Sequence, residues 1–219
     1  MRKQFAVIGL GRFGGSLART LGKLGADVLA VDVDPEKVQA IAPVVTEAVE
    51  ADATNEGVLG ELGLRNFDVV VVAISEFEAS LLITLYLKQI GVKEVVVKAG
   101  SDVHGRILES VGADKIVFPE KDMGRRLAYS LVSGSVIDYI DLSEDYGVVE
   151  VPVQGPLVGR TLSNLGLRSK FGINIVGIKR NSHVNVYINP EEPLREGDVM
   201  IAIGPTDGVQ RFSDMLERG

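Results

Sequence analysis

Residues 5–14 read FAVIGLGRFG, and this stretch decides the fold of the N-terminal half. A lone GxGxxG loop is weak evidence, but here it directly follows an apolar run and leads into a helix-forming segment. Gly9 permits a tight turn, Gly11 lets the backbone approach a phosphate, and Gly14 allows the helix to pack closely on the strand. The free N–H groups at the start of such a helix attract phosphate. The stretch therefore predicts a Rossmann-type domain that binds an adenine nucleotide.

Short apolar runs rich in Val and Ile recur as far as residue 118, at residues 5–8, 28–31, 69–74, 95–97 and 116–118. Such runs are typical of strands in a parallel sheet that is buried on both faces. Segments with helical character separate them, and Asp34-Pro35 supplies an N-cap acid followed by proline at the first helical position. The alternation predicts an α/β fold with a doubly wound parallel sheet.

Charged side chains near the glycine loop indicate which nucleotide the domain takes. Asp32 ends the second apolar run, where a carboxylate accepts hydrogen bonds from both ribose hydroxyls and disfavours NADP; an ordinary helix cap is the alternative. Arg12 could clamp a terminal phosphate, which favours ATP or ADP over NAD, or it could lie in solvent. Asp52 could face the adenine or cap a helix, and Lys98 ends a strand that points at the same crevice.

Composition narrows the class of protein. With 219 residues, 46% of them hydrophobic, and a mean hydropathy of +0.21, the chain has material for one full domain and a smaller one. The absence of Cys excludes disulfides, thiolate zinc sites and cysteine nucleophiles. A net charge of −7 argues against a nucleic-acid partner. Because no apolar run is long enough to span a bilayer and no signal peptide precedes the first strand, we expect a soluble, cytoplasmic protein.

The pattern changes after residue 118. A further helix is expected from residue 119 to about 138, and strands are expected at residues 146–154, 173–179, 184–188 and 199–203, with a tight turn at Asn181-Ser182. Short helices are expected near residues 162–165 and 207–216. We therefore predict a nucleotide-binding domain at residues 1–120, a crossover helix and linker at 121–140, and a small α+β domain at 141–219.

A dehydrogenase is the main alternative, because it shares the Rossmann fold. It would need an acid or base beside the nicotinamide, but His183 falls in the expected hairpin turn and His104 begins a surface helix, so we expect both to be solvated. With no catalytic constellation in view, we predict that the chain is not an enzyme. Residues 81–87 are apolar on almost every side, which favours a subunit interface over a helix buried in its own domain.

Taken together, several motifs resemble the RCK family of regulators of potassium conductance. They are residues 9–15, Asp32, residues 51–54, residues 112–114 (GAD) and residues 118–124 (FPEKDMG). The resemblance spans nearly the whole chain and is strongest to the Ktr-type cytosolic subunits of bacterial potassium uptake systems, with Trk-type subunits as relatives. It implies a Rossmann-like N-lobe, a crossover helix and a small C-lobe. It further implies homodimers that form an octameric ring, with residues 81–87 in the ring surface, peripheral to the inner face of the membrane beneath a potassium channel subunit.

The resemblance also implies ligands and the residues that hold them. ATP would activate and ADP would inactivate the channel, with NAD(H) sensing as the alternative and an NAD-dependent oxidoreductase as a weaker one. The implied nucleotide contacts are Gly9, Gly11, Arg12, Phe13, Gly14, Asp32, Val33, Lys37, Asp52, Ala53, Thr54, Ser75 and Lys98. Glu120 would help to hold Mg²⁺ or another cation at the phosphates, or would be an ordinary first-turn carboxylate. The implied site for cyclic di-AMP comprises Arg168, Asn174 and Ile175, although Asn174 could instead stabilise a turn.

Overall fold

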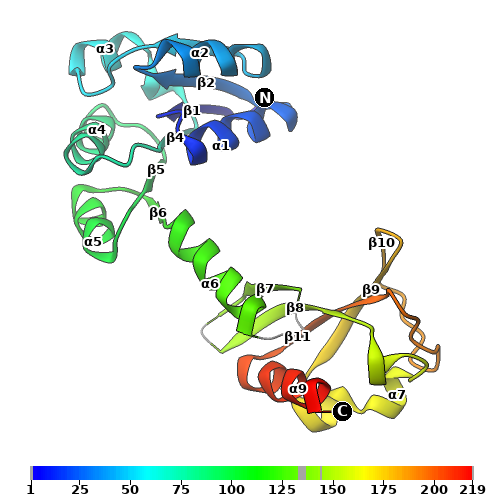
Figure 1. The fold of residues 1–219 in the computed structure, drawn as a ribbon. Coiled ribbons are helices and arrows are strands. Elements are labelled where there is room, and N and C mark those ends of the chain that lie inside the picture. Colours follow the sequence, from blue (N-terminus) through cyan, green and yellow to red (C-terminus); the bar gives the residue numbers. More distant parts are fainter. Residues whose placement is uncertain (1, 133–136, 144, 219) are drawn as a thin grey trace. The chain divides into compact units, whose positions relative to one another are not determined.

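A computed structural model of the chain describes residues 2–132, 137–143 and 145–218. The chain divides into two compact units, Met1–Glu120 and Lys121–Gly219 (Figure 1). Each unit has its own sheet and its own hydrophobic core, so each is described by itself.

The first unit contains a six-stranded parallel sheet in the order β3-β2-β1-β4-β5-β6. Its strands are β1 Gln4–Ile8, β2 Asp27–Asp32, β3 Glu47–Glu50, β4 Val69–Val72, β5 Val95–Lys98 and β6 Lys115–Val117. The doubly wound parallel sheet predicted from the apolar runs is confirmed. The order reverses between β1 and β4, and in sheets of this kind a ligand binds in the crevice at that switch point.

Helices cover both faces of this sheet. They are α1 Arg12–Lys23, α2 Pro35–Ile41, α3 Glu56–Glu61, α4 Phe77–Gln89 and α5 Asp102–Val111. One core cluster contains Leu59 from α3, Leu87 from α4 and Leu108 from α5, whereas a second contains Ala18 from α1 and Ile41 from α2. The sheet is therefore buried on both faces, which explains why β4 consists of four valines and why the polar residues of β1, β2 and β5 lie at the ends of those strands.

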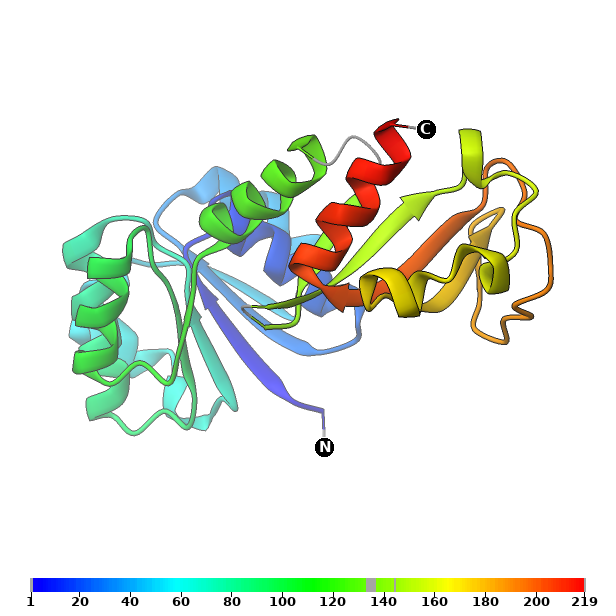
Figure 2. The ribbon, with the colours of Figure 1, turned by 90° about the horizontal axis from the view of Figure 1, so that it is seen from below.

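The chain passes along α6 (Pro119–Val132) to the second unit, which holds a five-stranded antiparallel sheet in the order β10-β9-β11-β8-β7. Its strands are β7 Asp138–Asp141, β8 Tyr146–Pro152, β9 Asn174–Arg180, β10 His183–Asn185 and β11 Val199–Pro205, and its helices are α7 Leu162–Leu165, α8 Leu167–Phe171 and α9 Thr206–Arg218. Figure 2 shows α9 lying along one face of this sheet, where Phe212 enters the core.

Three details after residue 118 differ from the expectation. The helix expected to reach about residue 138 is α6, which ends at Val132. The sheet begins at Asp138, inside the stretch assigned to the linker, because β7 pairs with β8 through a short connection. The predicted strand at residues 184–188 ends at Asn185. The expected hairpin turn at Asn181-Ser182 is present, and both residues have a positive φ, as a type I′ turn requires.

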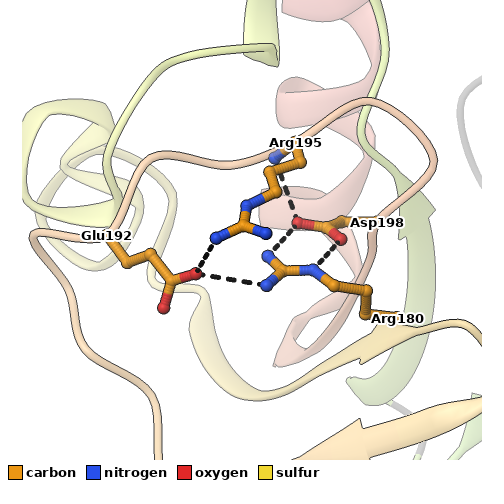
Figure 3. Close-up of polar contacts among 4 residues, drawn as sticks. All are labelled: Arg180, Glu192, Arg195 and Asp198. Atoms are coloured by element: carbon orange, nitrogen blue, oxygen red, sulfur yellow. Dashed lines mark hydrogen bonds and ion pairs between the residues drawn. The ribbon is translucent and has the colours of Figure 1, made fainter.

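Arg180, Glu192, Arg195 and Asp198 form an ion cluster in the second unit, called the Arg180 cluster below (Figure 3). Arg180 donates from Nε and Nη2 to the two carboxylate oxygens of Asp198 at 2.6 and 2.7 Å. Glu192 accepts from both arginines, and the backbone N–H of Arg195 donates to Asp198. Asp198 is only 1% exposed, and its hydrogen bonds with Arg180 lower the pKa of its carboxyl group. The cluster thus pins the connection before β11 to β9.

Candidate functional site

A cavity of about 430 Å³ lies at the carboxyl ends of β1, β2 and β4, at the switch point of the parallel sheet. This is the place where doubly wound sheets bind their ligands. Its lining comes from the strand ends and the loops that follow them, namely Ile8, Gly9, Gly11, Val31, Asp32, Val33, Lys37, Ala51, Asp52, Ala53, Thr54, Ala73, Ile74, Ser75 and Ala79.

The glycine loop borders this cavity in a conformation that explains its sequence. Gly9 has φ +93°, and a Cβ there would lie 2.9 Å from Cγ1 of Ile74. A Cβ on Gly14 would lie 1.9 Å from the carbonyl oxygen of Gly9, so α1 can pack this closely only without a side chain. A Cβ on Gly11 would meet no described atom within 4 Å. The backbone of Gly11, which precedes the first turn of α1, therefore adjoins open space that a phosphate can fill.

Asp32 connects the glycine loop to the turn after β2. Its Oδ2 accepts the N–H of Leu10 at 2.6 Å, and its Oδ1 accepts the N–H of Asp34 at 2.9 Å. Lys37 places Nζ 3.5 Å from Oδ1 of Asp32 and 3.3 Å from Oδ2 of Asp34. A carboxylate offers about four acceptor positions, so Asp32 keeps capacity for a ribose hydroxyl after these contacts. Asp34 also caps α2 through the N–H of Glu36, as predicted.

Asp52 shapes the opposite wall of the cavity. Its Oδ1 accepts the N–H and the hydroxyl of Thr54 at 2.9 and 2.7 Å, and these bonds lower the pKa of its carboxyl group. The helix-cap alternative for Asp52 is wrong, because Asn55 caps α3 through the N–H of Gly57. Asp52 instead closes a tight turn with Thr54, ahead of the cap of α3, and it lines the cavity together with Ala53 and Thr54.

Ser75, Lys98 and Glu120 lie along the other side of the switch point. Nζ of Lys98 is 3.2 Å from Oγ of Ser75 and 2.6 Å from Oε1 of Glu120. The Lys98 side chain is 11% exposed, whereas that of Glu120 is 68% exposed. The hydrogen bond from Lys98 lowers the pKa of Glu120. In the part of the chain that the structure describes, no group of three or more His, Cys, Asp or Glu side chains could hold a metal ion, so Glu120 is at most one ligand of a cation site.

Other predicted nucleotide residues flank the cavity. Arg12 is exposed at the start of α1, beside the described lining, and Phe13 is half-buried in the same turn. Sequence reasoning missed the apolar walls formed by Ile8, Ala73 and Ile74. The sequence could have predicted them, because Ile8 ends β1 and Ala73 and Ile74 directly follow β4, the two strands on either side of the switch point.

His104 is buried, so the prediction that it is solvated was wrong. It is 4% exposed, and its Nδ1 accepts the N–H of Gly100 at 3.3 Å. Nε2 therefore carries the proton and donates to Oγ of Ser80 at 2.8 Å, and Ser80 donates to the carbonyl of Phe77. Burial lowers the pKa of His104. The side chain lies on the inner face of α5, whereas His183 is exposed in the hairpin as expected.

The apolar helix at residues 81–87 belongs to α4 and has two distinct faces. Ile83 and Leu87 are buried in the first-unit core. The same helix buries two hydroxyls, Ser80 and Thr84, which bond to backbone carbonyls of their own helix. Its opposite face exposes large apolar side chains, which continue onto α5: Phe77, Leu82, Leu85, Val103 and Ile107. The helix therefore packs in its own domain with one face, and the predicted interface concerns the other.

The residues predicted for a second ligand lie in the second unit. Arg168 is exposed in α8, and Asn174 is exposed at the start of β9. Ile175 is half-buried and packs against the second-unit core. Asn174 pairs with Ile203 of β11 in the sheet register.

Family comparisons agree with this two-unit architecture. Residues 5–119 match the TrkA-N domain and residues 148–217 match the TrkA-C domain. The chain is 48% identical to the Ktr system potassium uptake protein C of Bacillus subtilis, over 97% of this chain and 96% of that protein. It is 44% identical to the Ktr system potassium uptake protein A of the same organism, with the same coverage.

The chain belongs to the RCK family, as a Ktr-type regulatory subunit. The predicted family resemblance is thereby confirmed, and its Ktr relatives are regulatory subunits rather than enzymes. A solved structure of the GsuK channel bound to NAD shares the fold, with a TM-score of 0.66 and 19% identity over 95% of this chain and 38% of that one. Among the described helices of this Ktr subunit, none combines the length and apolar character needed to cross a bilayer.

Proposed function

We propose that this Ktr subunit senses adenine nucleotides in the first-unit cavity and thereby controls a membrane potassium channel subunit. The observation that carries the proposal is the cavity at the switch point, where open backbone at Gly11 adjoins a carboxylate at Asp32. The backbone N–H groups at the start of α1 suit phosphates, and Asp32 suits a ribose. The Ktr relatives are named potassium uptake proteins, which supports potassium transport as the regulated process.

ATP is the activating ligand in this proposal, and ADP is the inactivating one. A ligand can shift an equilibrium between two conformations only by the difference between its affinities for them. The additional phosphate of ATP would reach Arg12, which is exposed beside the cavity, and Arg12 of a second copy. Glu120 would contribute a carboxylate to Mg²⁺ or another cation at those phosphates. ADP lacks the third (γ) phosphate and would leave these contacts unmade.

Assembly into homodimers and an octameric ring would convert this binding into movement of the channel subunit. The exposed apolar side chains of α4 and α5 support such an assembly, because contiguous apolar surface favours association. In this proposal the ring is peripheral at the inner face of the cell membrane, attached through the channel subunit.

NAD(H) sensing is the second candidate. Asp32 would accept the ribose hydroxyls of NADH as well as those of ATP, and the GsuK channel of the same fold is bound to NAD. Thermal-shift titrations with ATP, ADP and NADH, with and without magnesium, separate the two candidates, because a ligand that binds the folded state raises its Tm. Shifts with ATP and ADP are expected. A shift with NADH and none with ATP would reject the proposal in favour of the second candidate.

A second ligand, cyclic di-AMP, is proposed for the second unit, where it would inhibit transport. Arg168 and Asn174 are both exposed, and they supply a guanidinium for a phosphate and an amide for a base. In the same thermal-shift experiment, cyclic di-AMP should raise Tm in the presence of saturating ATP, and Arg168→Ala should remove that increment alone. An Arg168→Ala variant that keeps the full Tm increment with cyclic di-AMP would contradict this assignment.

A further inference from the structure

Lys98 and Glu120 form an ion pair beside the nucleotide cavity. The function proposed above does not explain why these two residues pair with each other. Lys98 ends β5, and its Nζ is 2.6 Å from Glu120 and 3.2 Å from the hydroxyl of Ser75. An ammonium that is nearly buried is costly unless a counter-charge compensates it. Glu120 provides that charge from the first turn of α6, where its own side chain is largely exposed and free to leave.

The sheet order places this pair on a definite side of the cavity. Asp32 ends β2 on one side of the switch point, whereas Ser75 follows β4 and Lys98 ends β5 on the other. A nucleotide whose ribose lies at Asp32 and whose first phosphates lie at the glycine loop extends its remaining phosphates towards β4. Ser75 lines the cavity there and contacts Lys98. The ammonium is therefore within reach of the end of a polyphosphate chain.

We propose that Glu120 is an internal competitor for nucleotide phosphate, and that Lys98 is the residue that selects nucleotides with a free terminal phosphate. In the empty protein the Glu120 carboxylate takes the position on Lys98 that a terminal phosphate takes in the complex. This inference rests on the proposed function, because it presumes that the cavity binds adenine nucleotides.

The exchange follows from charge. A terminal phosphate brings nearly two negative charges and three acceptor oxygens, whereas the Glu120 carboxylate brings one charge, so the phosphate is the stronger partner for the ammonium. The two phosphates of a dinucleotide are both internal and carry one charge each. The second nucleoside of a dinucleotide such as NADH would lie over the Lys98–Glu120 pair, and it carries no phosphate charge that could displace Glu120 from Lys98. When a phosphate displaces Glu120 from Lys98, the Glu120 carboxylate becomes available to a cation. Nucleotide binding therefore precedes cation binding at Glu120.

The test measures the affinities of ATP, ADP and NADH by calorimetry in EDTA, so that no divalent cation can use Glu120. Glu120→Gln removes the competitor and should tighten ATP and ADP binding about two- to fivefold, the range expected for losing one partly exposed ion pair. NADH binding should not change. Lys98→Met should weaken ATP and ADP binding by about fivefold or more and leave NADH binding unaltered.

Glu78→Gln is the matched control, since Glu78 is an exposed carboxylate in the first turn of α4 at the same edge of the sheet. It removes the same charge and should leave ATP affinity unchanged. Unchanged or weaker ATP binding by the Glu120 variant would overturn the inference, as would an equal gain in the Glu78 variant. If the unaltered protein binds none of the three nucleotides, the proposed function itself fails. Circular dichroism of the Lys98 variant verifies that it is folded.

Discussion

Charged side chains in the first unit border an open cavity, whereas those of the Arg180 cluster in the second unit bind one another. Asp198 is surrounded by the guanidinium of Arg180 and the N–H of Arg195, with little exposure to solvent. Asp32 also accepts hydrogen bonds from its own chain, yet it keeps acceptor capacity and lines a cavity of about 430 Å³. The comparison teaches that a dense ion cluster stabilises the fold, and that charged side chains can bind a ligand only where a cavity adjoins them.

The largest expected effect concerns the glycine loop. Gly14→Ala places a Cβ 1.9 Å from the carbonyl oxygen of Gly9, so α1 must move away from β1. We expect unfolding in urea to show a loss of about 3 kcal/mol and nucleotide binding to disappear. Gly11→Ala is the control, because it meets no described atom and its φ of −61° suits any residue. It should cost about 1 kcal/mol or less. Equal destabilisation by both variants would contradict this account.

Asp198→Ala tests the second unit. It leaves the guanidinium of Arg180 facing a vacated, buried position, and we expect a loss of about 2–4 kcal/mol in the free energy of unfolding. Nucleotide affinity, measured by calorimetry on the folded variant, should stay unchanged, since the cavity belongs to the first unit. A variant with normal stability would show that the Arg180 cluster is dispensable.

His104 makes stability depend on pH. Burial lowers its pKa in the folded state, so the unfolded chain, with a pKa near 6.5, takes up the proton first. The contribution of His104 is complete above about pH 6.5 and is lost as the pH falls towards the lowered folded-state pKa. Between pH 7.5 and 5.5 we expect the free energy of unfolding of His104→Gln, measured in urea, to fall less than that of the unaltered protein. His183→Gln, in the exposed hairpin, should retain the full pH dependence.

The smallest expected effect concerns Arg12, which is exposed beside the cavity. Arg12→Ala should reduce the preference for ATP over ADP about fivefold in calorimetric titrations, because one charge-assisted contact to the terminal phosphate is lost. Arg19→Ala, a change to an exposed arginine farther along α1, should preserve the preference. If the Arg12 variant still distinguishes ATP from ADP as well as the unaltered protein, the proposed switch contact is wrong.

The features that could be predicted from the sequence were those set by residues close together in the chain. The glycine loop, the apolar runs and the Asp34-Pro35 helix start each depend on residues close in sequence, and the structure contains the predicted strands and helix start. The errors arose where neighbours come from distant segments. His104 looked exposed because nothing near it in sequence announces Ser80, 24 residues earlier, as its partner. Asp52 and Asn55 are both plausible caps, and only the helix start at Glu56 separates them.

The sequence by itself determined the fold class, the family and the glycine loop, because these follow from residue spacing and backbone preferences that act within a few positions. Only the tertiary structure decided how the side chains at the strand ends combine. It set Asp32 to hold Leu10, paired Lys98 with Glu120, and turned one face of α4 inward while leaving the other exposed. Those outcomes depend on strand order and packing, which bring residues 22 or more positions apart into contact.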